Sequence, residues 1–152
     1  MIALRLAIDT NILVSAALKP ARLQRTVLVL AISKPAPLYV SGAIPGEYRE
    51  VLSRTELRIR KGRRRQILHL LNNHARIVKP TRTLRIATDT DDDKFIECAD
   101  AARADYLVTG NPRHFPKFWK KMKTKVITPL EFIGIVAPHL ISRRKSLMRI
   151  IK

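Results

Sequence analysis

Acidic side chains stand at three separate points of the chain where a strand is expected to end or a helix to begin. Asp9 follows the apolar run Leu4–Ile8, Glu47 lies in the first turn of an expected helix, and a dense acidic run spans residues 89–93. In open α/β folds, the residues that follow the strands line a crevice at the carboxyl edge of the sheet. Carboxylate oxygens that meet there suit a hard divalent cation such as Mg²⁺ or Mn²⁺. A cation so held lowers the pKa of a bound water and neutralises charge on a phosphodiester.

The acidic run 89–93 is the densest group of negative charges in the chain. Asp92 is a candidate N-cap of the following helix, because an aspartate side chain accepts hydrogen bonds from free backbone N–H groups. One cap explains only one acid, and four acids in five positions repel one another unless a cation neutralises them. Asp92 and Asp93 are therefore both candidate ligands. Glu47 also has a simpler explanation, which is the favourable interaction of an acid with a helix N-terminus.

Basic residues greatly outnumber acidic ones. The chain has 30 Lys and Arg against 12 Asp and Glu, a formal net charge of +18 and a pI near 11.1. Such a surface attracts polyanions, with nucleic acid the first candidate and an anionic membrane surface the second. An acidic protein partner, or charge that serves only solubility, is the alternative. The side chains expected to contact nucleic acid are Arg54, Arg63, Arg64, Arg65, Arg113, Lys117, Lys120 and Lys121.

Composition narrows the class of protein further. The 152 residues suffice for one domain with a real core, and the 46% hydrophobic content is ordinary for a globular protein. The one cysteine, Cys98, rules out an intramolecular disulfide and a Cys-rich zinc site. The start of the chain lacks the pattern of a signal peptide, and no apolar stretch approaches the roughly 20 residues of a membrane span. We expect a cytoplasmic protein without a membrane partner.

Hydrophobic periodicity predicts alternating strands and helices. Strands are expected over residues 2–9, 38–41, 75–78, 105–109 and 126–128, and helices over 21–33, 45–52, 67–74, 92–104 and 129–136. The apolar segment 11–18 has no assigned element. This alternation favours right-handed βαβ units and a parallel sheet, with Thr109 and Asn111 at the same edge as Asp9. We expect one domain over residues 1–137 and a basic tail, helical in part, over 138–152.

Four ordered segments of the chain resemble the motifs of PIN-domain proteins. These segments are residues 9–11 after the first strand, Ser41 with residues 47–54, residues 89–95, and residues 109–116. The similarity covers roughly residues 4–135 and is closest to a bacterial group described as toxins of toxin–antitoxin pairs. It implies a three-layer α/β/α sandwich with a central, mostly parallel sheet. It also implies a metal-dependent ribonuclease that cuts RNA by water attack at phosphorus and is held inactive by an antitoxin protein.

The resemblance also suggests a role for particular residues. Asp9, Glu47 and Asp92 match the family's metal-binding acids, with Asp93 as the alternative within the acidic run. Asn111 matches a fourth position that is often Asp, and a neutral amide is a weaker ligand for a cation. The neighbouring polar side chains of Thr10, Asn11 and Thr109 would orient these ligands and water. The expected cofactor is Mg²⁺ or Mn²⁺, and the expected partners are RNA, an acidic antitoxin and a second copy of the chain.

Two other functions stay open at this point. A non-catalytic RNA-binding or regulatory protein with a weakened metal site would explain both Asn111 and the high positive charge. A DNA nuclease of related architecture would use the same acids on a different polyanion. Metal binding separates the first alternative from a nuclease, and side-by-side cleavage of RNA and DNA separates the second.

Overall fold

The fold is built on five short parallel strands. The computed structural model describes residues 4–18, 23–32, 38–115 and 122–137. The strands are β1 (Leu6–Ile8), β2 (Tyr39–Ser41), β3 (Arg76–Val78), β4 (Tyr106–Val108) and β5 (Lys125–Ile127). One group pairs in the order β1-β4-β5 and the other pairs β2 with β3. A parallel bridge between Leu6 and Leu38 joins the two groups, so the strand order is 3-2-1-4-5.

The central strand β1 is buried along its whole length. Its residues Leu-Ala-Ile are at most 1% exposed, which is typical of a parallel strand covered on both faces. β1 pairs with β4 in a register that sets Leu6 opposite Tyr106 and Ile8 opposite Val108. Because the strands are parallel and in register, the residues that follow β1 and β4 emerge at the same edge.

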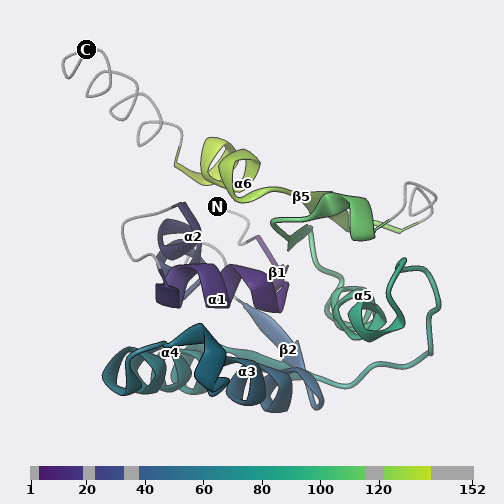
Figure 1. Cartoon of the computed structure of the whole chain (residues 1–152). Helices are drawn as coiled ribbons and strands as arrows, with labels where there is room; N and C mark the ends of the chain where they lie inside the picture. The colour runs from purple at the N-terminus through teal and green to yellow at the C-terminus, as the bar shows by residue number, and fades with distance from the viewer. Residues whose placement is uncertain (1–3, 19–22, 33–37, 116–121, 138–152) are drawn as a thin grey trace.

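Helices cover both faces of this sheet. They are α1 (Thr10–Leu18), α2 (Leu23–Ile32), α3 (Ile44–Leu52), α4 (Lys61–His74), α5 (Asp93–Ala102) and α6 (Pro129–Val136). Among the described residues, the connections contain the short 3-10 helices η1 (Thr55–Leu57), η2 (Thr90–Asp92) and η3 (Pro112–His114). α5 packs on β1, β2 and β4, and Figure 1 shows α1 and α2 on the opposite side of the strands. The predicted three-layer α/β/α sandwich with a parallel sheet is confirmed.

The hydrophobic core lies between the sheet and these helices. Its largest fully buried side chains include Tyr48 of α3, Phe95 of α5 and Phe132 of α6. The predicted apolar stripe of α5, with Phe95, Ile96 and Ala99, is buried as expected from helical spacing. Within the described part of the chain, no helix is both long enough and apolar enough to cross a membrane.

Two helices differ from the sequence prediction, one because it was not assigned and one because it begins earlier. The segment 11–18 forms α1, which starts at Thr10 directly after the first strand. α4 begins at Lys61 inside the basic run, six residues before the predicted start at residue 67. Arginine and lysine are good helix formers, and Gly62 lies in the first turn of α4, where it does not interrupt the helix interior. Local helix propensity therefore allows α4 to begin nearer the N-terminus than predicted. The predicted tail 138–152 lies outside the described residues, and the domain boundary at 137 stays a prediction.

Candidate functional site

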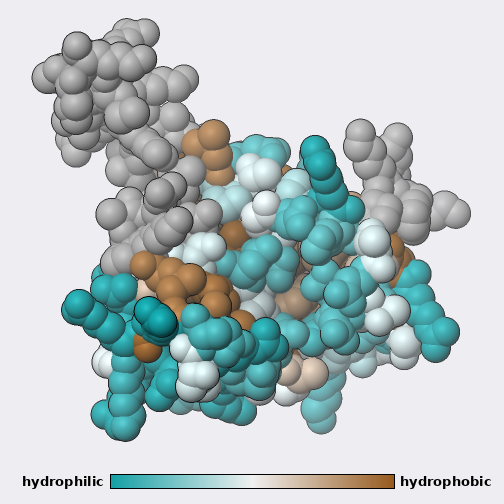
Figure 2. Space-filling model, viewed as in Figure 1, coloured by the Kyte–Doolittle hydropathy of each residue, from teal (hydrophilic) through white to brown (hydrophobic). Residues whose placement is uncertain are grey.

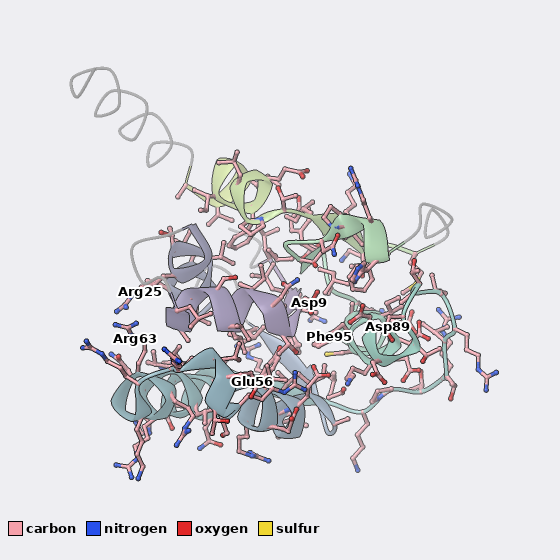
Figure 3. The ribbon with its side chains drawn as sticks, in the orientation of Figure 1. Asp9, Arg25, Glu56, Arg63, Asp89 and Phe95 are labelled. Carbon is pink, nitrogen blue, oxygen red and sulfur yellow. The ribbon has the colours of Figure 1, made fainter. Side chains whose placement is uncertain are left out.

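The polar residues after β1 and β4 meet at one edge of the sheet. In the strand order 3-2-1-4-5, the chain leaves β1 toward β2 on one side and returns to β4 on the other. Ligands of open α/β sheets bind in the crevice at such a switch point. Asp9 follows β1 and donates its backbone N–H to Val108 O at 3.0 Å, and Thr109 follows β4. Figure 3 shows Asp9 at the start of α1, on the side that faces Phe95 of α5.

Asp9 is a buried carboxylate. Its exposed fraction is 6%, and the Thr109 hydroxyl donates to its Oδ2 at 2.8 Å. Burial is the main cause that raises the pKa of Asp9, and the nearby negative charge of Glu47 adds to it. Hydrogen bonds from Thr109 and from the backbone N–H groups of Asn11 and Thr10 partly offset this rise in pKa. Asp9 therefore has a charged form that a nearby cation would stabilise.

Glu47 reaches the same region from the first turn of α3. The Thr10 hydroxyl donates to Glu47 Oε2, and Lys94 Nζ forms an ion pair with Glu47 Oε1. Both side chains of the ion pair are largely shielded, at 25% exposure for Lys94 and 22% for Glu47. Sequence reasoning did not assign Lys94 to the site, although its place directly after the acidic run was a usable signal. Lys94 holds Glu47 in one orientation beside the start of α1.

Asp92 joins the site from the end of η2. Its pKa is raised, mainly by burial and then by the negative charge of Asp9, and a hydrogen bond with His114 opposes the rise. His114 Nδ1 lies 3.2 Å from Asp92 Oδ2. The predicted capping role of the Asp92 side chain is wrong, because it makes no hydrogen bond to the backbone of α5. The cap in this run is Asp89, whose Oδ1 accepts from Asp91 N at the start of η2.

The Asp93 carboxylate accepts hydrogen bonds from backbone N–H groups. It is 6% exposed, and its Oδ1 accepts hydrogen bonds from Ile86 N at 2.9 Å and from Ala87 N at 2.8 Å. These bonds fasten the loop that leads into η2 to the first turn of α5. Of the two alternatives in the acidic run, Asp92 is therefore the better candidate ligand, because Asp93 already satisfies two backbone groups.

Asn111 lies beside Thr109 and His114. Its backbone N–H donates to Thr109 Oγ1 at 3.1 Å, and its Nδ2 lies 2.8 Å from His114 Nε2. The predicted support from Asn11 takes the form of a long hydrogen bond, in which Asn11 Oδ1 accepts from Gly110 N at 3.4 Å. His114 was not predicted as a site residue, and its position three residues after Asn111 carried no recognisable signal by itself.

The donor set suits a hard divalent ion that is completed by water. Among the residues that the structure describes, no three His, Cys, Asp or Glu side chains are grouped closely enough to hold an ion without rearrangement. Mg²⁺ in proteins usually keeps several waters and takes only one or two carboxylates. Asp9 and Asp92, whose charges interact, supply that number. Burial raises the pKa of the Cys98 thiol to about 12, so sulfur offers no thiolate ligand near neutral pH.

The predicted nucleic-acid contacts divide into different groups. Arg54 forms an exposed ion pair with Glu50 at 3.0 Å, and Arg65 and Arg113 are exposed. Arg63 instead donates to Ala17 O at 2.8 Å and joins α4 to the end of α1. One of its N–H groups therefore serves the fold, and its predicted contact with nucleic acid stays a prediction. Arg64 is partly buried, and the predicted contacts Lys117, Lys120 and Lys121 lie outside the described residues.

The fold and the site together define a class: a three-layer α/β/α protein with acidic residues gathered at the switch point of a parallel sheet. Residues 5–113 match the family model of the PIN domain, which is most of the chain. The chain belongs to the PIN-domain family. PIN domains are generally nucleases, and they typically use divalent metal ions.

Two similar proteins bear on this assignment. An uncharacterized protein of Methanocaldococcus jannaschii is 30% identical over 142 residues, which cover 87% of this chain and 91% of that protein. The crystal structure of VapBC2 from Rickettsia felis, bound to a DNA fragment from its promoter, contains a chain of similar fold. That match has a TM-score of 0.55 and 18% identity, and it covers 82% of this chain and 98% of the other. At that identity the structural match supports the fold.

Proposed function

We propose that this protein is an endoribonuclease that depends on Mg²⁺ or Mn²⁺ bound by Asp9 and Asp92, with Glu47 as a third acid beside them. The observation that carries the proposal is that acids from the end of β1, from α3 and from η2 lie near enough for their charges to interact, Glu47 with Asp9 and Asp9 with Asp92. Burial and mutual repulsion raise the pKa values of Asp9 and Asp92 there. A divalent cation relieves this repulsion, and membership of a family of nucleases points to the reaction.

The chain's own residues hold the acids in place for hydrolysis. Thr109 orients Asp9, while Thr10 and Lys94 orient Glu47. When bound, the ion supplies a water of lowered pKa and neutralises charge on the phosphodiester. The water oxygen forms a bond to phosphorus, the bond from phosphorus to the leaving oxygen breaks, and a proton returns to that oxygen.

RNA is the proposed substrate because the acids alone would repel a polyanion. The net charge of +18 draws the strand to the protein, and exposed cations such as Arg65 and Arg113 contact its phosphates. The motif resemblance and the structural similarity to VapBC2 support a further proposal about partners. This proposal is that the protein is a toxin, held inactive by an acidic antitoxin and able to pair with a second copy of itself.

The test is cleavage of a single-stranded RNA and of the DNA of the same sequence, with Mn²⁺, Mg²⁺ or EDTA. Wild type is expected to cut RNA only with metal, and Asp9→Asn and Glu47→Gln are expected to cut at background level. Glu50→Gln is the matched control, because Glu50 lies on the same helix as Glu47 but pairs with Arg54 at the surface.

The same assay separates the alternatives. Full activity of Asp9→Asn would refute the assigned site. Faster cleavage of the DNA would favour the DNA nuclease. RNA binding without cleavage, together with no Mn²⁺ binding in calorimetry, would favour the non-catalytic protein.

A further inference from the structure

A chain of hydrogen bonds connects Asp9 with Asp92 around the fourth corner of the site, which Asn111 occupies. Asn111 N donates to Thr109 Oγ1 at 3.1 Å, and Thr109 Oγ1 donates to Asp9 Oδ2 at 2.8 Å. On its other side, Asn111 Nδ2 lies 2.8 Å from His114 Nε2, and His114 Nδ1 lies 3.2 Å from Asp92 Oδ2. Asn111 and His114 thus stand between the two candidate ligands.

The donors and acceptors of this chain fit in one arrangement. An amide nitrogen donates and does not accept, so His114 Nε2 must accept from Asn111. The proton of a neutral ring is then on Nδ1, where it donates to Asp92 Oδ2. Turning the Asn111 amide around would move the proton to Nε2 and set a bare Nδ1 against a carboxylate oxygen. The Asp92 carboxylate can only accept, so it favours the proton on Nδ1, and the Asn111 amide then presents its N–H to the unprotonated Nε2.

The backbone holds both residues rigidly. Asn111 directly precedes the 3-10 helix η3 and His114 is its last residue, and His114 N donates to Asn111 O at 3.1 Å. Pro112 begins η3 and restricts the backbone at that point. His114 O accepts from Thr88 N at 2.9 Å, which fastens η3 to the segment just before the acidic run. The side chains are presented by a closed turn and not by a free loop.

We propose that Asn111 and His114 are a positioning pair that fixes Asp92 and gives the site the capacity for one divalent ion. This inference rests on the proposed metal-dependent function. Asn111 donates its amide N–H to His114, and His114 donates to Asp92, so neither side chain offers a carboxylate oxygen to a second cation at this corner. The ring N–H also engages Asp92 Oδ2, so Oδ1 is the oxygen of Asp92 that remains for an ion. Asn111 thus acts through His114, and its predicted role as a metal ligand is replaced.

The tautomer of His114 tests the pair without any metal or substrate. The full chain is labelled with ¹⁵N-histidine, and its ring nitrogens are observed by NMR in EDTA at a pH where histidines are neutral. We expect His114 as the Nδ1–H tautomer in wild type and a loss of that preference in Asn111→Asp, because a carboxylate at residue 111 can only accept and would compete for a proton on Nε2. His74, at the exposed end of α4, is the reference in the same spectra. An Nε2–H tautomer of His114 in wild type would overturn the proposal.

Calorimetric titration with Mn²⁺ tests the capacity for one ion. Wild type and the Glu50→Gln control are expected to bind one ion per chain, and Asn111→Ala is expected to bind it about 10–100-fold more weakly. The double variant Asn111→Asp with His114→Ala adds a carboxylate and removes the imidazole ring beside it. This variant should bind two Mn²⁺ ions per chain.

The outcomes distinguish this inference from the proposed function. Two ions on wild type, or a single ion on the double variant, would overturn the inference and leave the nuclease in place. Absence of any Mn²⁺ binding to wild type would overturn both.

Discussion

Asp9 is the residue at which burial and charge conflict most directly. Its carboxylate is 6% exposed, close to the charge of Glu47, and has a raised pKa. A raised pKa means that the folded state holds the proton more tightly than the unfolded state. Stability therefore falls as the pH rises from the ordinary value of 3.8 through the folded pKa, and the cost persists at neutral pH.

Asp9→Asn should therefore stabilise the metal-free protein while it abolishes cleavage. In EDTA, the Tm of the variant should exceed that of wild type by an amount that grows as the pH rises from about 4 toward neutral. Addition of Mn²⁺ should raise the Tm of wild type and leave that of the variant unchanged. Thermal unfolding over a pH series measures both effects. A lower Tm of the variant at neutral pH in EDTA would contradict this account of Asp9.

Asp93 and Asp92 should respond differently to the same substitution. Asp93→Ala leaves Ile86 N and Ala87 N without their acceptor, so the free energy of unfolding should fall by about 2–3 kcal/mol. Asp92→Ala removes a carboxylate that serves no backbone group in α5, so it should abolish Mn²⁺ binding with little loss of stability. Urea denaturation and calorimetry separate the two results. If Asp93→Ala kept its stability but lost Mn²⁺ binding, Asp93 and not Asp92 would be the metal ligand.

At the scale of elements, α3 is fastened to the end of β1 by one buried hydrogen bond. The Tyr48 hydroxyl donates to Ile8 O at 2.6 Å, and Tyr48 is 2% exposed. Burial raises the pKa of Tyr48 far above its usual range, so the phenol stays a neutral donor. Ile8 directly precedes Asp9, and Tyr48 directly follows Glu47. This bond therefore sets the relative position of two of the candidate ligands.

Tyr48→Phe should weaken both the fold and the site. The ring still fills its place in the core, but Ile8 O loses a buried donor, which should lower the free energy of unfolding by about 1–2 kcal/mol. The rate of RNA cleavage should fall by more than the loss of folded protein explains, because the assay is run under conditions in which the variant remains folded. Urea denaturation and the RNA assay give the two values. An unchanged free energy of unfolding would show that the hydrogen bond from Tyr48 to Ile8 O does not stabilise the fold.

At the scale of the whole molecule, the full chain has a formal net charge of +18. The face shown in Figure 2 is mostly hydrophilic, with a hydrophobic area near α1 and α2. The basic residues of α4 do not all have one role. Arg63 is joined to α1 through Ala17 O, and Figure 3 shows it close to Arg25 of α2. Arg65 is exposed, so it is available to a polyanion.

Arg65→Ala and Arg63→Ala form a matched pair on one helix. Arg65→Ala should lower the slope of log affinity for single-stranded RNA against log salt by about 0.7, because one phosphate contact is lost. Its Tm should not change. Arg63→Ala should lower the free energy of unfolding by about 1 kcal/mol through the lost bond to Ala17 O. Filter binding over a salt series measures the RNA affinity, and urea denaturation measures the free energy of unfolding. If Arg63→Ala changed only the salt dependence and Arg65→Ala only the stability, the two roles would be exchanged.

Local order in the sequence is enough to predict the sheet and the places of the acids. Alternating apolar segments predicted a parallel α/β sheet, and the acids were placed directly after strands or at helix starts. The position of Asp9 after a strand and of Glu47 in a first helical turn follows from nearby residues, whereas the role of Glu47 as a ligand came from the motif resemblance. The motif resemblance added the family and its chemistry.

The partners of these residues follow from tertiary packing, which the local sequence does not specify. Lys94 meets Glu47 across 47 residues of sequence, and Thr109 meets Asp9 across 100. The different roles of Asp92 and Asp93 follow from which one reaches the loop at residues 86–87 and which one reaches His114. Contacts of this kind depend on how β1, β4 and α5 pack. Adjacent residues of the same type therefore acquired different roles that no local pattern distinguishes.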